Sequence, residues 1–421
     1  MSEKITTSLY HLLSQPTQTT DLRAELIGFS HEDWRKFKDL AENHSLLPLV
    51  YARLKGLGMS HYIPADYQEN MHLAYLTNAV RNALFLHEAK TVLQALNKVK
   101  IPVIALKGIY LLENIYPDIS IRTMNDLDLM LKKGDIQAAL SVCQSLRYQP
   151  TTYFDIQDDN LDIKHVPPLI KEPGPYLEMH WTILEEKRPF TIDAEGLWRR
   201  AVPTVIAGVD AFALSPEDLI LHLCLHLAYQ HHFNVGLRGL CDIAAVLRHF
   251  EGQLDWHKLV DTAQAWGATR VLWLSLTLVG DVLAENVPST LLEGIQPAPL
   301  DPWVIEEARS QLESRGRTSR VMTPDLAKFA AEKGFFSRIR LVWGRIFLPR
   351  RVLARLYNVR PTSPRILGCY FKRAAELVKQ YRTSVKHILT EDTDTLVSAE
   401  TQDANQRLKA WMAGSVDEFQ L

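Results

Sequence analysis

The spacing of apolar residues along the chain changes twice. Up to residue 98 they recur at helical spacing, which predicts helices over 1–65 and one long amphipathic helix over 66–98. From residue 102, short apolar runs and alternating patterns predict a strand–helix–strand–helix–hairpin unit of roughly 80 residues. Helical spacing returns at Ser215-Pro216-Glu217, a favourable helix start. The pattern therefore predicts an α+β protein in which a small unit with strands is embedded in a mostly helical chain.

The chain is long enough for several domains, and composition narrows its class. It has 421 residues, a net charge of -2, 47% hydrophobic and 23% charged residues, which argues against wholesale disorder and against a molecule that coats nucleic acid. The segments that we expect are an N-terminal helical region (1–65), a unit carrying the site (66–190), a helical domain (191–290), a basic helical C-terminal region (291–390) and an acidic, polar tail (391–421).

Cysteine usage and the N-terminus bear on location. Cys143, Cys224, Cys241 and Cys369 are scattered without CxxC spacing, which fits a reducing compartment. We see neither a signal-peptide pattern at the N-terminus nor an uncharged apolar run of about 18 residues. The expected location is the cytoplasm.

Charge is uneven near the C-terminus. Within 333–386 the one acidic residue is Glu376, whereas the basic residues are Lys333, Arg338, Arg340, Arg345, Arg350, Arg351, Arg355, Arg360, Arg365, Lys372, Arg373, Lys379, Arg382 and Lys386. Aromatic residues are interleaved with them. This stretch is either a solvated helix face or a surface for anionic lipid, nucleic acid or a phosphorylated acceptor.

Two carboxylates in an apolar strand pattern are the strongest chemical signal. Asp126 and Asp128 alternate with Leu127 and Leu129, so they project from the same side of a strand. Two carboxylates so close repel unless a cation lies between them, and oxygen ligands on a rigid strand suit Mg²⁺. The purely structural alternative is a strand start whose carboxylates pair with a basic residue such as Arg122.

The residues around this pair extend the site. Lys107-Gly108 lies between a predicted strand and a helix start, where backbone N–H groups favour phosphate. A nucleoside triphosphate with Mg²⁺ would satisfy both features. Glu178 on a later strand is the best third carboxylate, and His180 shares its face. Lys107 and Arg122 either hold phosphate or balance the aspartates as structural ion pairs.

Three short motifs together resemble a known family. They are, in chain order, apolar-Lys107-Gly108, Arg122-x-Met124-x-Asp126-x-Asp128 and Glu178-x-His180-Trp181. This set resembles the bacterial nucleotidyltransferase-like family of the polymerase-beta nucleotidyltransferase superfamily, and the similarity covers residues 65–250. The resemblance implies a small mixed sheet with helices on one side, two Mg²⁺ ions and transfer of a nucleoside monophosphate to a hydroxyl. Lys107 stands where the superfamily usually has Gly.

The resemblance also implies roles. Asp126 and Asp128 would bind the catalytic metals, and Glu178 would complete the second metal site and activate the acceptor hydroxyl. Gly108 would let the backbone approach the β- and γ-phosphates, with Lys107 adding charge. The reaction would be in-line attack on the α-phosphate with pyrophosphate leaving.

Two further sets of residues have competing interpretations. His222 and His226 have the i, i+4 spacing of zinc sites, with His231 and His232 nearby, but no Glu follows the first His, which favours a core or substrate-facing helix. Arg238 and Asp242 are also i, i+4. They form either a plain helix ion pair or a contact that reaches the nucleotide from the helical domain.

Three functions remain open from the sequence. The first is a Mg²⁺-dependent nucleotidyltransferase that acts on a small molecule, a sugar or lipid-linked acceptor, or a protein hydroxyl. The second is a degenerate protein of the same fold that binds nucleotide or a partner without turnover. The third is a transferase acting on RNA ends, which the basic C-terminal region favours and the near-neutral net charge does not.

Overall fold

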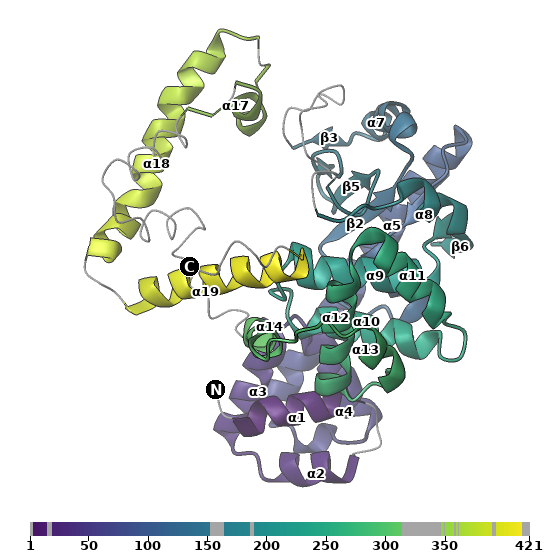
Figure 1. Cartoon of the computed structure of the whole chain (residues 1–421), viewed down its shortest axis with the longest axis vertical. Coiled ribbons are helices and arrows are strands. Elements are labelled where there is room, and N and C mark those ends of the chain that lie inside the picture. Colours follow the sequence, from purple (N-terminus) through teal and green to yellow (C-terminus); the bar gives the residue numbers. More distant parts are fainter. Residues whose placement is uncertain are drawn as a thin grey trace.

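A seven-stranded mixed sheet lies among helices from both ends of the chain (Figure 1). The structure is a computed structural model that describes residues 3–14, 19–151, 164–185, 189–313, 347–348, 350–357, 359–360, 362–389 and 393–414. Within these ranges, no helix combines the length and the apolar character that crossing a bilayer would take. The predicted α+β class is confirmed.

Among the described residues, five α-helices precede the sheet, where the apolar spacing predicted helices. They are α1 (Glu3–Leu13), α2 (Thr19–Ile27), α3 (His31–Asn43), α4 (Leu47–Gly56) and α5 (Ala65–Lys98). A capping box starts α3, because the Ser30 hydroxyl accepts from Asp33 N and the Asp33 carboxylate accepts from Ser30 N. The 34-residue α5 is the long helix expected over 66–98.

The sheet has the strand order β3-β4-β5-β2-β1-β7-β6. Its strands are β1 (Ile104–Ala105), β2 (Asp126–Met130), β3 (Gln149–Pro150), β4 (Leu169–Ile170), β5 (Tyr176–His180), β6 (Val202–Ile206) and β7 (Val209–Ala213). Strands β2 and β5 are parallel, as are β1 and β7, and the other pairs are antiparallel. The β6–β7 hairpin lies within 191–290, which the sequence predicted to be helical, so the sheet continues past residue 190.

Short helices connect the strands. They are α6 (Lys107–Tyr110) with a π-helical turn over Leu111–Ile115, α7 (Ile136–Ser145) and α8 (Ala194–Arg200). Leu127 and Leu129 of β2 are fully buried. Burial of such a leucine contributes about 1.5–3 kcal/mol, which holds the strand in register.

Helix α5 packs against β6 and β7 and anchors the loop that leads into β2. Asn97 Nδ2 donates to Asp210 O of β7 at 2.9 Å. Further along α5, Asn78 Nδ2 donates to Ser120 O at 2.7 Å, and Asn82 Nδ2 donates to Arg122 O at 2.8 Å. Because the side chains of Asn78 and Asn82 are buried, their amides fix the loop backbone just before the aspartates.

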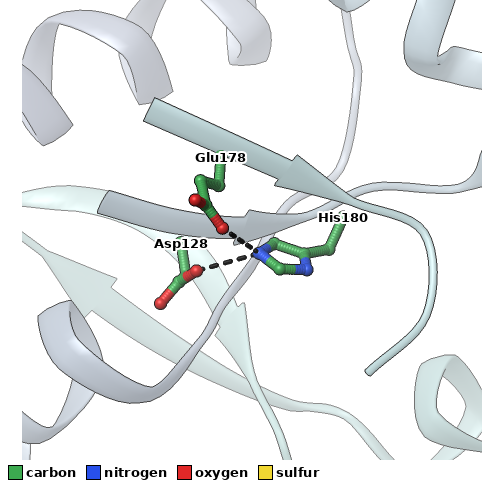
Figure 2. A group of neighbouring side chains, drawn as sticks. All are labelled: Asp128, Glu178 and His180. Atoms are coloured by element: carbon green, nitrogen blue, oxygen red, sulfur yellow. Dashed lines mark hydrogen bonds and ion pairs between the residues drawn. The ribbon is translucent and has the colours of Figure 1, made fainter. Parts of the chain in front are cut away.

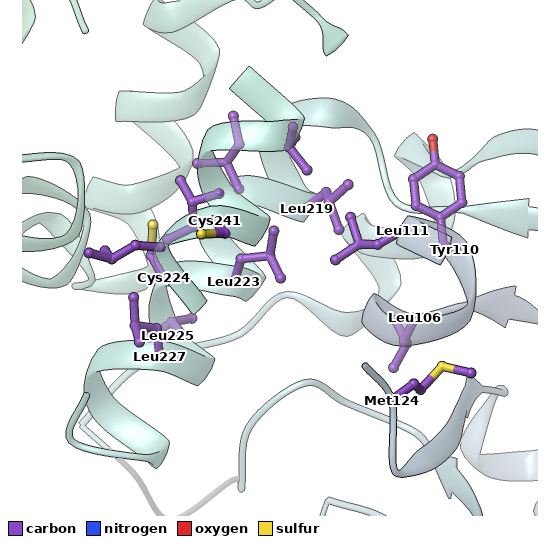
Figure 3. Packing of buried hydrophobic residues seen from close by; sticks show 14 of the residues in the cluster. Leu106, Tyr110, Leu111, Met124, Leu219, Leu223, Cys224, Leu225, Leu227 and Cys241 are labelled. Atoms are coloured by element: carbon purple, nitrogen blue, oxygen red, sulfur yellow. The ribbon is translucent and has the colours of Figure 1, made fainter. Parts of the chain in front are cut away.

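Helices follow the sheet. They are α9 (Pro216–Cys224) with a π-helical turn over Leu225–Gln230, α10 (Leu237–His249), α11 (Trp256–Trp266), α12 (Thr269–Leu283), α13 (Ser289–Ile295), α14 (Trp303–Glu313), α17 (Arg350–Leu356), α18 (Arg365–Leu389) and α19 (Thr393–Met412). Ser215 caps α9 by accepting from Asp218 N, as its sequence predicted. Figure 3 shows Leu219 and Leu223 of α9 in the apolar cluster that also holds Leu111.

The segment predicted to be an acidic, polar tail contains helix α19, and the end of this helix packs on the core. Leu408 and Met412 are buried, and the ring of Trp411 lies 6.2 Å from that of Trp273 in α12. Arg270 Nη1 donates to Trp411 O at 2.8 Å. A few apolar residues in an otherwise polar stretch therefore dock this helix, and residues 415–421 lie outside the described ranges.

Candidate functional site

The pairing of β2 with β5 brings the two acidic motifs together. In this parallel pair Asp128 lies opposite Glu178, and Asp126 lies opposite Tyr176. Residues two apart on a strand share a face, so Asp126, Asp128 and Glu178 project from the same side of the sheet. The predicted proximity of Glu178 to the aspartates is therefore present in the fold.

Asp128, Glu178 and His180 form a compact polar cluster (Figure 2). His180 Nε2 lies 2.8 Å from Asp128 Oδ1 and 3.4 Å from Glu178 Oε2. One potential ligand atom from each of the three residues lies within 4.8 Å of the others, a spacing that could hold a metal ion. Among the described residues, no other group of three or more His, Cys, Asp or Glu side chains has such a spacing.

Asp126 lies beside this cluster but is not one of its three members. Burial raises the pKa of Asp126, and the negative charges of Asp128 and Glu178 raise it further, while Lys107 opposes them. The carboxylates therefore repel one another, as the sequence predicted, and a further cation at this face would relieve that repulsion.

Lys107 supplies one positive charge. Its Nζ lies 3.3 Å from Asp128 Oδ2, and both side chains are buried. This contact is the structural ion pair that the sequence left open as an alternative to phosphate binding. Burial alone would raise the pKa of Asp128, but Lys107 and the hydrogen bond with His180 hold it well below its usual value. Asp128 is thus ionised.

The backbone at Lys107 is strained. Its φ is +27°, a region that favours glycine. This is the position where the superfamily resembled by the sequence usually has Gly. Strain at a non-glycine residue is typical of a functional site and persists where surrounding contacts over-determine it. Here the ion pair with Asp128 is one such contact.

Gly108 is required by close packing. A Cβ at this position would lie 2.7 Å from Met124 Sδ and 3.0 Å from Met124 Cγ. Met124 is itself buried, in the cluster drawn in Figure 3. The glycine therefore lets α6 approach the loop before β2, which is a reason independent of the predicted phosphate contact.

Gly108→Ala should lower the free energy of unfolding by about 1–3 kcal/mol, because the new methyl group overpacks against Met124. Urea unfolding would measure it. In Gly108→Ala/Met124→Ala the two costs should be less than additive, since the double variant removes the clash. Unchanged stability with weakened triphosphate binding would instead assign Gly108 to the phosphates.

Arg122 and Asp242 form a buried bidentate pair. Arg122 Nε and Nη2 donate to Asp242 Oδ1 and Oδ2, each at 2.8 Å, and Tyr116 Oη donates to Asp242 Oδ1 at 2.9 Å. Arg238 does not form the helix pair with Asp242, which was one of two alternatives from the sequence, but donates from Nη1 to Thr123 O at 2.9 Å. These contacts commit Arg122 to Asp242, so they do not favour a phosphate contact by Arg122.

Lys164 was missed by the sequence analysis. Its Nζ donates to Gln230 Oε1 at 2.9 Å, and Gln230 Nε2 donates to Ile183 O at 2.8 Å. Burial lowers the pKa of Lys164 to about 8, helped by the positive charge of Lys107. Asp128 and Glu178 oppose the shift, which puts Lys164 within electrostatic reach of the carboxylates. No local motif marks such a lysine.

His165 and His226 also approach the site. His165 Nε2 lies 3.8 Å from Glu178 Oε2, and its ring lies 4.8 Å from that of His180. His226 sits on the π-helical turn after α9, and such turns are frequent at functional sites. Burial lowers the pKa of His226, and so does the charge of Lys107. The imidazole is therefore neutral.

The four histidines of this helical segment do not build a metal site. His222, His226, His231 and His232 contribute to none of the metal-type groups in the described part of the chain. Burial lowers the pKa of His222 well below its usual value, with Lys107 adding to the effect. The imidazoles of His222 and His226 are therefore both neutral.

Comparison with known proteins gives one match. A family model described as an uncharacterised nucleotidyltransferase matches residues 30–284. No curated protein and no solved structure matches the chain. The matched range contains the whole sheet and helices α3 to α12.

Proposed function

Because the chain belongs to the uncharacterised nucleotidyltransferase family, we propose that it moves a nucleoside monophosphate from a nucleoside triphosphate to an acceptor hydroxyl, with Mg²⁺ as cofactor. The observation that carries this proposal is the register of β2 and β5, which sets Asp128 beside Glu178 on the face that also bears Asp126. Nucleotidyl transfer needs such grouped carboxylates to hold metal and to accept a proton.

The residues present fit a divalent cation. Asp128 and Glu178 offer oxygen ligands within reach of one another, and Asp126 carries a pKa raised by burial and by their charge. Asp126, Asp128 and Glu178 would hold the ion, with His180 as a further ligand or as the group that orients Asp128. Bound Mg²⁺ would supply charge neutralisation on the phosphates.

In the proposed reaction the acceptor hydroxyl oxygen attacks the α-phosphorus. The bond from the α-phosphorus to the bridging oxygen breaks, and pyrophosphate leaves. Glu178 would take the hydroxyl proton. Burial would raise its pKa, but the hydrogen bond with His180 keeps that pKa low, so the carboxylate is ionised and free to accept a proton. Lys107 and Lys164 would bind the triphosphate oxygens and offset their charge.

A catalytically degenerate binding protein is the second candidate. The observation that favours it is the ion pair of Lys107 with Asp128 at 3.3 Å, because an internal cation there competes with a metal ion. Such a protein would bind nucleotide or a partner with no release of pyrophosphate.

Mn²⁺ binding, followed by electron paramagnetic resonance, tests the metal site without knowledge of the acceptor. The full chain should bind Mn²⁺, and Asp126→Asn/Asp128→Asn should abolish that binding. Asp210→Asn, the same isosteric change at an exposed position in the β6–β7 hairpin, is the matched control and should bind normally. Equal binding by all three proteins would reject the site.

Triphosphate affinity should depend on the protonation of Lys164. Its pKa of about 8 means that the free protein carries this charge below pH 8 and loses it above. The Kd should therefore be flat below pH 8 and rise above it, by about tenfold or more once the charged contact is lost. Lys164→Arg should remove this rise, because arginine stays protonated.

Calorimetry across this pH range, with Mg²⁺ present, is the measurement. A second check is proton uptake on binding above pH 8, read from the dependence of the binding heat on the buffer. If the wild type and Lys164→Arg have the same pH profile, Lys164 does not contact the triphosphate.

A further inference from the structure

Helices α17 and α18 form a small unit with its own core. Their buried residues pack in a cluster separate from the main core, made of Leu353, Ala354, Ile366 and Cys369. The segment before α17 joins this unit, since Tyr370 Oη donates to Leu348 O at 2.9 Å and the rings of Phe347 and Tyr370 stack 5.8 Å apart. In Figure 1 the pair stands apart from the sheet.

The unit exposes large apolar side chains. Phe371 is 81% exposed and Leu367 is 57% exposed. They lie four residues apart on α18, so they share one side of the helix. Phe347, Val352 and Leu356 are also substantially exposed. Exposed apolar groups gathered on one small unit indicate a surface that docks on something apolar.

The same unit is strongly basic. Arg350, Arg360, Arg365 and Lys372 are exposed in the described structure. Glu376 is the one acidic residue in the sequence from 347 to 389. Its carboxylate accepts a hydrogen bond from Tyr357 Oη at 2.7 Å and lies 4.0 Å from Lys372 Nζ. A partner that binds the whole unit would therefore offer anionic as well as apolar groups.

We propose that the α17–α18 unit docks the protein on an anionic membrane surface. Lys and Arg side chains bind acidic headgroups, while Leu367 and Phe371 enter the boundary between headgroups and acyl chains. Nucleic acid would engage the cations but would leave the aliphatic side chains Val352, Leu356 and Leu367 without an apolar partner. This proposal concerns a surface outside the matched family range and does not depend on the transfer activity.

Flotation of the full chain with lipid vesicles tests the proposal. Vesicles of phosphatidylcholine with one third phosphatidylglycerol should bind the protein, and pure phosphatidylcholine should bind it much more weakly. Leu367→Ser/Phe371→Ser should weaken binding about tenfold or more, because two apolar side chains are no longer transferred from water into the lipid. Arg365→Gln/Lys372→Gln should weaken it by about fivefold per charge, and added salt should do the same.

Leu73→Ser/Leu84→Ser on α5 is the matched control, because these leucines are 61% and 60% exposed. This variant should bind vesicles as the wild type does, and circular dichroism should show all variants folded. The proposal is overturned if phosphatidylglycerol does not increase binding, or if the α5 variant loses as much vesicle binding as the α18 variant. It is equally overturned if a single-stranded RNA oligonucleotide binds the protein while vesicles do not.

Discussion

Asp128→Asn should reduce the release of pyrophosphate from a nucleoside triphosphate by about 1,000-fold or more, equivalent to about 4 kcal/mol of transition-state stabilisation. Asp128 is buried and lies opposite Glu178 in the sheet. Lys107 and His180 lower its pKa and so keep it ionised. The amide keeps the shape of the side chain but removes the charge that holds a cation. A steady-state pyrophosphate assay with each ribonucleoside triphosphate would measure the loss.

Loss of folding must be separated from loss of chemistry in this experiment. Thermal unfolding of Asp128→Asn reports whether the neighbours Lys107 and His180 tolerate the change. Asp210→Asn, at an exposed position of the β6–β7 hairpin, should keep full activity. A folded Asp128→Asn protein with wild-type turnover would contradict the proposed role of the carboxylate.

Arg122→Ala should lower the free energy of unfolding by about 3–5 kcal/mol, because it leaves Asp242 as an unpaired buried charge. Asp242→Ala should lower the free energy of unfolding by a similar amount, because it leaves Arg122 as an unpaired buried charge. For a chain of this size we expect the melting temperature to fall by about 3–6 °C. Chemical denaturation of each variant measures the effect.

The double variant Arg122→Met/Asp242→Leu provides the control. Replacing both charges by apolar side chains should cost much less than the two single changes together, because no buried charge is stranded. The contrary outcome is a stable Arg122→Ala protein that binds triphosphate poorly. That result would assign Arg122 to the phosphates, one of the two roles that the sequence left open.

Local patterns in the sequence predicted much of the fold and part of the site. Alternation of Asp126, Leu127, Asp128 and Leu129 predicted strand β2, and the helical spacing over 66–98 predicted α5. Both depend on side-chain periodicity, which a sequence displays directly. A turn signal was available for the missed hairpin, because a run rich in β-branched residues, Val202–Ile206, precedes Ala207-Gly208, whose positive φ angles make the turn into Val209–Ala213.

Long-range pairing could not be predicted in the same way. The i, i+4 spacing suggested that Asp242 pairs with Arg238, but the structure pairs it with Arg122, 120 residues earlier in the chain. The buried Asp242 carboxylate needs several donors, and Arg122 supplies two of them in a bidentate contact while Tyr116 supplies a third. Likewise, the low pKa of Lys164 depends on burial and on Lys107, far away in sequence.

One calorimetric experiment tests most directly whether the carboxylate face of β2 and β5 binds a nucleoside triphosphate with Mg²⁺. The full chain is titrated with each of the four ribonucleoside triphosphates, with and without Mg²⁺, alongside Asp126→Asn/Asp128→Asn. We expect binding with a Kd of about 10⁻⁶ M, or roughly −8 kcal/mol, that needs Mg²⁺ and is absent in the double variant. If no triphosphate binds in either condition, or if the double variant binds equally well, the carboxylate face of β2 and β5 is not a nucleotide site.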